Sequence, residues 1–118
     1  MSVAHAPGKL VLSGAYVVLD GAEAVVVAVD RYAIAYADRQ GSVHSPELRE
    51  AFPGQAPPFV DTSAMWTRER KIGLGSSSAA LVAALGVRSV FPGTLAGDAA
   101  LRTDILERAY AAHRRAQG

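Results

Sequence analysis

The first forty residues show apolar runs separated by turn-forming residues, as β-strands do. Residues 9–19 (KLVLSGAYVVL) and 22–37 (AEAVVVAVDRYAIAYA) are rich in Val, Tyr and Ile, residue types that favour strands. The pair Asp20-Gly21 lies between the two runs. An Asp-Gly pair between two apolar runs is a strong signal of a hairpin turn. The pattern therefore predicts a β-hairpin.

The second of these strands ends in an alternation of large and small side chains. Residues 32–37 read Tyr-Ala-Ile-Ala-Tyr-Ala, which predicts one tightly covered face. A second turn is expected at 39–42, with a short strand near Val43. Residues 46–59 contain four of the six prolines with charged residues between them. This composition is typical of a surface loop, in which residues 47–52 could form one helical turn.

The second half of the chain has a helical pattern. Residues 79–85 contain no polar side chain, and a helix that is apolar on all sides is a buried central helix. Pro92-Gly93 is expected to end it. Asp98 is a good N-cap for a last helix over 99–116.

One face of that last helix repeats apolar residues at helical spacing, namely Leu101, Ile105, Ala109 and Ala112. Strands grouped before helices favour the α+β class. We therefore expect a mixed β-sheet with helices on one face.

Composition excludes several classes of function. The 118 residues carry 12 Lys and Arg against 11 Asp and Glu, a net charge of +1, which offers no basic surface for nucleic acid. The absence of cysteine excludes disulfides, thiolate metal sites and a cysteine nucleophile. The three histidines are scattered and predict no metal site. Without a membrane-length apolar run or a leader-like N-terminus, we expect no membrane partner and a cytoplasmic location.

Residues 73–78, Gly-Leu-Gly-Ser-Ser-Ser, are the strongest candidate for chemistry. The two glycines let the backbone turn sharply and approach a ligand closely. The serines open the predicted helix, whose first turn offers unpaired N–H groups and partial positive charge. Their hydroxyls add donors, and one of them can ligate Mg²⁺. Such a segment suits a chain of phosphates.

The segment matches neither of two common phosphate-binding motifs. No Gly-Lys-Ser/Thr ends it, so it is not a Walker A loop, and Ser78 replaces the third glycine of GxGxxG. The alternative interpretation is a plain turn with a serine N-cap.

A second candidate is Lys9, at the expected start of the first strand in Ala-Pro-Gly-Lys. A lysine there can reach an anionic substrate as a point charge. The alternative is an exposed strand lysine.

Together, residues 6–21 (APGKLVLSGAYVVLDG) and 71–79 (KIGLGSSSA) resemble the GHMP kinase family, and most closely its phosphomevalonate kinases. The final residues 112–118 (AHRRAQG) are similar to the same subgroup, so the resemblance covers the whole chain. Ala15-Tyr16 stands where mevalonate kinases usually have Glu-His. This difference favours the phosphomevalonate subgroup.

The resemblance implies a kinase that uses ATP and Mg²⁺ to phosphorylate 5-phosphomevalonate to diphosphomevalonate. Lys9 matches the catalytic lysine at the phosphoryl acceptor, and Ser77 matches the serine that ligates Mg²⁺. Ser78 stands where many members have alanine. The residues that match or adjoin the loop around the ATP phosphates are Gly73, Leu74, Gly75, Ser76, Ser77 and Ser78.

Family members are longer and carry a second domain, with the catalytic Asp in a Gly-Ser-Gly-x-Asp segment. The resemblance therefore implies that residues 1–118 are a partial N-terminal, ATP-binding domain with the C-terminal domain absent. We expect negligible kinase turnover from the isolated chain. We also expect self-association, marginal stability or a complementing chain, because the missing strands would otherwise cover the buried helix.

Three alternatives stay open. The first is mevalonate kinase or another GHMP kinase, with mevalonate, homoserine or a sugar as phosphoryl acceptor. The second is a non-catalytic module that binds a nucleotide or a partner. The third is a small α+β domain with a coincidental Gly-Ser turn.

Other residues carry weaker signals. We interpret Trp66 and Met65 as a small packing cluster, with a contact to adenine as the alternative. Arg68 and Arg70 beside Lys71 form a basic cluster that is solvated or that guides an anionic ligand.

Overall fold

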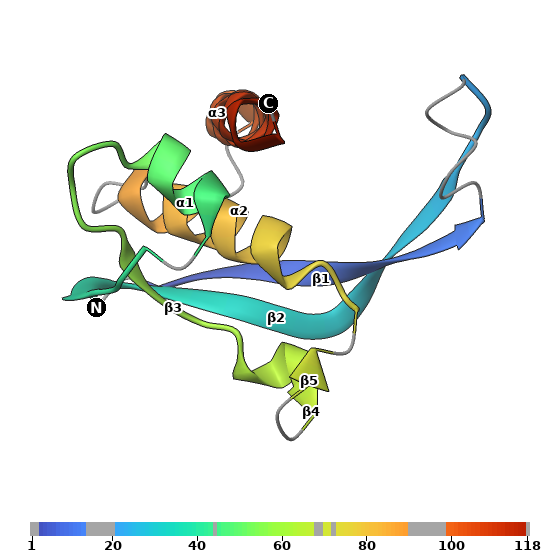
Figure 1. The fold of residues 1–118 in the computed structure, drawn as a ribbon, viewed down its shortest axis with the longest axis horizontal. Helices are drawn as coiled ribbons and strands as arrows, with labels where there is room; N and C mark the ends of the chain where they lie inside the picture. The colour runs from blue at the N-terminus through green and yellow to red at the C-terminus, as the bar shows by residue number, and fades with distance from the viewer. Residues whose placement is uncertain are drawn as a thin grey trace.

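A long antiparallel hairpin forms the frame of the molecule (Figure 1). In the computed structural model, which describes residues 3–13, 21–43, 45–67, 70–71, 73–89 and 99–117, strand β1 (Val3–Ser13) pairs with β2 (Val25–Gln40). Strand β3 (Pro58–Asp61) pairs antiparallel with the other edge of β2, so the order is β1-β2-β3. The predicted hairpin and the α+β class are confirmed. The described three-stranded sheet is antiparallel, so the prediction of a mixed sheet is wrong for these strands.

The strand boundaries differ from those predicted. Strand β1 begins at Val3 rather than at Lys9, so Lys9 lies inside the strand. Strand β2 runs to Gln40, because Gln40 still pairs with Pro58 of β3. Residues 41–43 form no strand, so the short strand expected near Val43 is not formed. Residues 14–20, including Asp20 of the predicted turn, lie outside the described residues.

The proline-rich segment contributes buried residues to the core at both of its ends. Helix α1 (Pro46–Ala51) begins after Ser45, whose hydroxyl accepts a hydrogen bond from the N–H of Leu48 at 3.2 Å. The side chain of Leu48 is fully buried, and so is that of Pro58 at the start of β3. Proline is tolerated at a helix start or a strand start because its missing N–H is not needed there. The predicted helical turn over residues 47–52 is confirmed by α1, and residues 53–56 are exposed and form no helix or strand, as predicted. The prediction of a surface loop is wrong for the buried residues of α1 and for the start of β3.

A short second hairpin connects the sheet to the central helix. The 3₁₀ turn η2 (Ser63–Met65) leads into β4 (Trp66–Thr67), which pairs with β5 (Arg70–Lys71). Met65 is fully buried, whereas Trp66 is 38% exposed. The predicted packing role therefore fits Met65 but describes Trp66 poorly.

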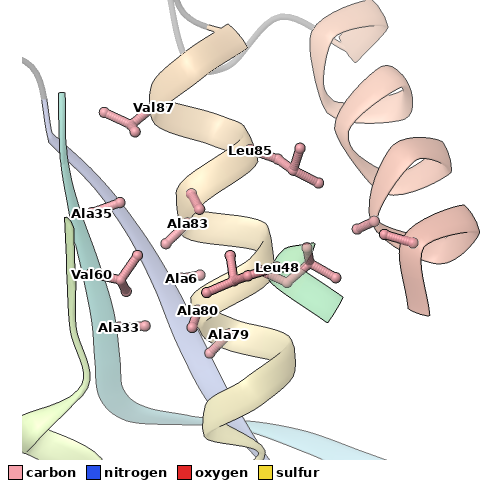
Figure 2. Packing of buried hydrophobic residues seen from close by; sticks show 14 of the residues in the cluster. Ala6, Ala33, Ala35, Leu48, Val60, Ala79, Ala80, Ala83, Leu85 and Val87 are labelled. Carbon is pink, nitrogen blue, oxygen red and sulfur yellow. The ribbon is translucent and has the colours of Figure 1, made fainter. Parts of the chain in front are cut away.

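Helix α2 (Ser76–Ser89) is the centre of the core. It contacts all three strands of the sheet as well as the other two helices. Alanines meet across the interface, with Ala33 and Ala35 on β2 facing Ala80 and Ala83 on α2 (Figure 2). The prediction of a buried central helix is confirmed. We expected this helix to be left uncovered by the missing strands. That expectation is wrong, because residues 79–87 are buried or half-buried under the described elements.

Helix α3 (Ala99–Gln117) covers α1 and α2. Ala109 and Ala112 are buried on its inner face, and Ile105 packs partly against the core. The predicted range and inner face are thus confirmed for the side chains that can be placed. The side chain of Leu101, the predicted stop at residues 92–93 and the predicted N-cap Asp98 lie outside the described part of the chain.

Apolar side chains are exposed where the end of β1 pairs with the start of β2, a part of the hairpin that we call its arm. The arm residues that expose them are Leu10, Val11, Leu12, Val25, Val26 and Val27. Self-association stays a prediction, and this arm, unlike the described part of α2, exposes large apolar side chains. Among the helices that the structure describes, none combines the length and apolar character needed to cross a bilayer.

The pairing of β1 with β2 is irregular at Gly8, where the loop before α2 approaches the hairpin. Pro7 pairs with Tyr32 and Lys9 pairs with Ala28, so residues 29–31 of β2 lie opposite Gly8 alone. A Cβ on Gly8 would lie 2.6 Å from the carbonyl oxygen of Leu74 and 3.2 Å from Cε of Met65. Only glycine fits this contact without movement of the backbone.

Replacing Gly8 by alanine tests this contact. We expect Gly8→Ala to lower the free energy of unfolding by about 1–3 kcal/mol, because the added methyl group overpacks the site. Gly86→Ala is the control, because a Cβ there would meet only Ala4 at an ordinary 3.5 Å and alanine stabilises a helix interior by about 0.5–1 kcal/mol. Urea unfolding of both variants measures the difference, and equal effects would contradict the close contact.

Candidate functional site

Lys9 and the Gly-Ser segment, far apart in the sequence, meet at the first turn of α2. The N–H of Lys9 donates a hydrogen bond to the carbonyl oxygen of Leu74 at 2.8 Å. A Cβ on Gly75 would lie 3.1 Å from Cγ and 3.6 Å from Nζ of Lys9. The lysine stem therefore lies over Gly75, with its ammonium group close to the start of the helix.

The loop before α2 depends on glycine. Gly73 has φ +74° and Gly75 has φ +70°, a left-handed conformation that other residues adopt only with strain. The carbonyl oxygen of Gly75 accepts the first helical hydrogen bond, from Ala79 at 3.0 Å, so Gly75 is the N-cap. The alternative of a serine N-cap is wrong. All three serines are instead in the first turn, where backbone N–H groups lack helical partners.

The three serines separate onto two hollows. Ser76 and Ser77 line a hollow of about 560 Å³, whereas Ser78 lines one of about 130 Å³ with Lys9. Successive helical residues are rotated by about 100°, so neighbours in the sequence face different directions. The other residues lining the larger hollow are Ser45, Phe59, Val60, Asp61, Thr62, Ser63, Trp66 and Ala80. Residues 76–78, which are consecutive in the sequence, therefore line two different hollows.

The sizes of the hollows distinguish what each can accept. Sites for small molecules and cofactors are typically about 300–1,000 Å³. The larger hollow falls in this range at about 560 Å³, and the smaller, at about 130 Å³, has room for a single small group. The exposed indole of Trp66 lines the larger hollow, where it offers an aromatic surface to a ligand.

Asp61 is a charged residue of the larger hollow that sequence reasoning missed. Its Oδ1 accepts a hydrogen bond from the N–H of Ser63 at 2.9 Å. That bond and the Ser63 hydroxyl lower the pKa of Asp61 below its ordinary value of 3.8. They outweigh partial burial, which raises the pKa, and the charge of Arg39 makes a smaller contribution that lowers it. The spacing Asp-x-Ser after an apolar strand was the available signal, since Asp bonds the backbone two residues on.

The donor atoms around the larger hollow fit a hard cation. Mg²⁺ prefers oxygen ligands and usually binds through one or two carboxylates together with substrate phosphates. Asp61 and Ser77 line the same hollow, and their side chains carry a carboxylate and a hydroxyl. No group of three or more His, Asp or Glu side chains suited to a metal exists in the described residues, so phosphates would have to complete the ligand set.

The remaining candidates lie elsewhere or cannot be placed. His5 contacts the ring of Tyr32 edge-on on the sheet. His113 lies 3.8 Å from Glu47, between α3 and α1. Neither histidine lines the two hollows. Arg68 and the side chains of Arg70 and Lys71, which form the predicted basic cluster, lie outside the described residues.

The low pKa of Asp61 makes a prediction about acid stability. A depressed pKa in the folded state stabilises the fold above the unfolded value, and this stabilisation is lost as the pH falls through the folded pKa. We expect wild type to be more stable than Asp61→Asn at neutral pH. The difference should shrink as the pH falls below about 3.8, the ordinary value of this carboxyl. Urea unfolding from pH 7 to acid measures it, and a pH-independent difference would exclude an ionised Asp61.

Comparison of the chain with known proteins identifies no relative. No protein-family model matches the sequence, and no curated protein or solved structure is similar to it. The functional interpretation therefore depends on the motifs and on the geometry of the two hollows.

Proposed function

We propose that this chain is the ATP-binding part of a GHMP-type phosphotransferase, with 5-phosphomevalonate as the phosphoryl acceptor. One observation carries the proposal. The two segments that resemble the family, around Lys9 and over residues 73–78, meet at the start of α2. This contact supports a single site formed by both segments.

The larger hollow takes the nucleotide in this proposal. Phosphate oxygens accept hydrogen bonds from the N–H groups and hydroxyls of Ser76 and Ser77, at the positive end of α2. Ser77 and Asp61 would hold Mg²⁺, which neutralises phosphate charge when bound. The base of the nucleotide lies toward Trp66, on which it can stack.

Lys9 faces the other side of the helix start and acts on the acceptor. Phosphoryl transfer depends mainly on positioning and on stabilisation of negative charge. The ammonium group of Lys9 supplies a positive charge beside the helix N-terminus. A second domain or a complementing chain would supply the general base and the far wall of the cleft.

A non-catalytic nucleotide-binding module is the second candidate. One observation favours it: among the described residues that line the smaller hollow, none carries a carboxylate or an imidazole. A general base for the acceptor hydroxyl is therefore absent from that hollow. Binding of Mg-ATP without turnover would support this candidate.

Gly75→Val tests the nucleotide site. The substitution strains a backbone at φ +70° and pushes against the Lys9 stem, so we expect Mg-ATP affinity to fall at least about tenfold, the loss of roughly one charge-assisted hydrogen bond. Isothermal titration calorimetry measures the affinity.

Gly54→Val is the matched control. Gly54 has the same φ of +70° but open space around its Cβ, so this variant carries the backbone strain without disturbing the site. We expect it to bind Mg-ATP as wild type does. Absence of Mg-ATP binding by wild type, or equal binding by Gly75→Val, would overturn the proposed function and favour a coincidental Gly-Ser turn.

A further inference from the structure

The arm of the hairpin exposes a strand edge as well as apolar side chains. Strand β1 lies at one edge of the three-stranded sheet, and among the described strands it pairs with β2 alone. The arm extends beyond the helices (Figure 1). We infer that the arm is a dimer interface, in which the β1 edges of two copies of this chain pair antiparallel about a twofold axis at Val11. This inference does not depend on the proposed function.

Both faces of the arm are apolar. Leu10 pairs with Val27 and Val11 pairs with Val26, and neighbours along a strand point to opposite faces. The exposed fractions of these four side chains range from 37% to 52%. Monomeric proteins rarely expose a contiguous apolar patch of more than a few hundred Å², and a two-stranded hairpin alone is at best marginally stable. Pairing with further strands would therefore stabilise the arm.

The arm lacks two features by which proteins protect a strand edge. Charged side chains and prolines normally discourage pairing at an edge, but residues 10–13 and 25–29 contain neither. The opposite edge of the described sheet, β3, has four residues and begins with the buried Pro58. Of these two edges, the arm of β1 is therefore the one suited to pairing with another strand.

The residues along the β1 edge fit a second copy of the same strand. An antiparallel pair of identical strands is symmetric about a twofold axis, the commonest symmetry of soluble oligomers. With the axis at Val11, Leu10 lies opposite Leu12 of the second copy, and apolar cross-strand pairs stabilise a sheet. Lys9 lies opposite Ser13, so the two lysines do not face each other. The edge is thus complementary to itself.

Pairing at the arm should stop at two copies. Each copy contributes the β1 edge to a twofold contact, which closes the assembly instead of extending it. A specific interface buries at least about 1,000 Å² in total. The half-exposed aliphatic side chains of the two arms, together with the paired backbone, supply an area near this lower limit. We therefore expect a reversible dimer rather than an obligate one.

Matched lysine variants test the edge pairing. Val11 and Val26 are the same residue type and pair with each other within the hairpin, so a lysine at either position perturbs the hairpin similarly. We expect Val11→Lys to weaken dimerisation at least about tenfold, because it places two ammonium groups opposite each other at the axis. Analytical ultracentrifugation over a range of concentrations measures the dissociation constants, and circular dichroism checks that both variants fold.

Val26→Lys is the control for charge on the arm away from the edge. In the dimer the two new lysines are separated by three strand spacings, about 14 Å, which exceeds the Debye length of about 8 Å at physiological salt. We therefore expect Val26→Lys to weaken dimerisation by less than about threefold.

Hydrogen exchange of the wild type provides a readout that needs no variant. Backbone N–H groups at the outer edge of the β1 arm become hydrogen-bonded in the dimer, so their exchange should slow as the protein concentration rises. The N–H groups of β3 should show no such change.

The possible outcomes separate edge pairing from other contacts. A wild type that stays monomeric up to about 1 mM, or that dimerises without slower exchange in β1, would overturn the inference. Equal losses in the two lysine variants would overturn edge pairing in favour of packing through a face of the arm. Growth into larger assemblies would overturn the twofold closure.

Discussion

The hydrogen bond from Lys9 N–H to the carbonyl oxygen of Leu74, with Gly8 directly beside it, is the constraint on which the rest of the site depends. It ties the first strand to the loop that precedes α2. At this point three residues of β2 lie opposite Gly8, so the strand pairing is irregular beside the hydrogen bond. Arg31, within that irregular stretch, donates to the carbonyl oxygen of Ala64 at 3.2 Å and so joins the same region to η2.

The alanines between β2 and α2 fix the position of the helix on the sheet. Ala33 and Ala35 have no exposed surface, and small side chains let α2 lie close to the sheet (Figure 2). A larger residue at these positions would lift the helix and overpack the core. Because the first turn of α2 is continuous with this buried helix, its N–H groups and serines are held rigidly against the hairpin. Rigid support of this kind is what precise ligand positioning requires.

The site is therefore two-sided, with the start of α2 as the partition. On one side a hollow of about 560 Å³ is lined by an acidic residue, several serines and Trp66, and on the other a mainly apolar hollow of about 130 Å³ has Lys9 and Ser78 among its lining residues. A phosphate chain and a phosphoryl acceptor must approach each other from opposite directions for in-line transfer. The partition supports the proposed phosphotransferase role for this reason.

The sequence by itself determined the local elements and the candidate chemistry. The Asp-Gly pair and the apolar runs predicted the hairpin, the unbroken apolar stretch predicted the buried helix, and the Gly-Ser motif gave the candidate ligand-binding segment. These features follow from neighbouring residues. The tertiary structure alone decided that Pro58 is buried, that Asp61 and Ser77 line the same hollow, and that Ser78 and Lys9 line another. Each of these depends on contacts between distant segments and on helix rotation, which no local pattern specifies.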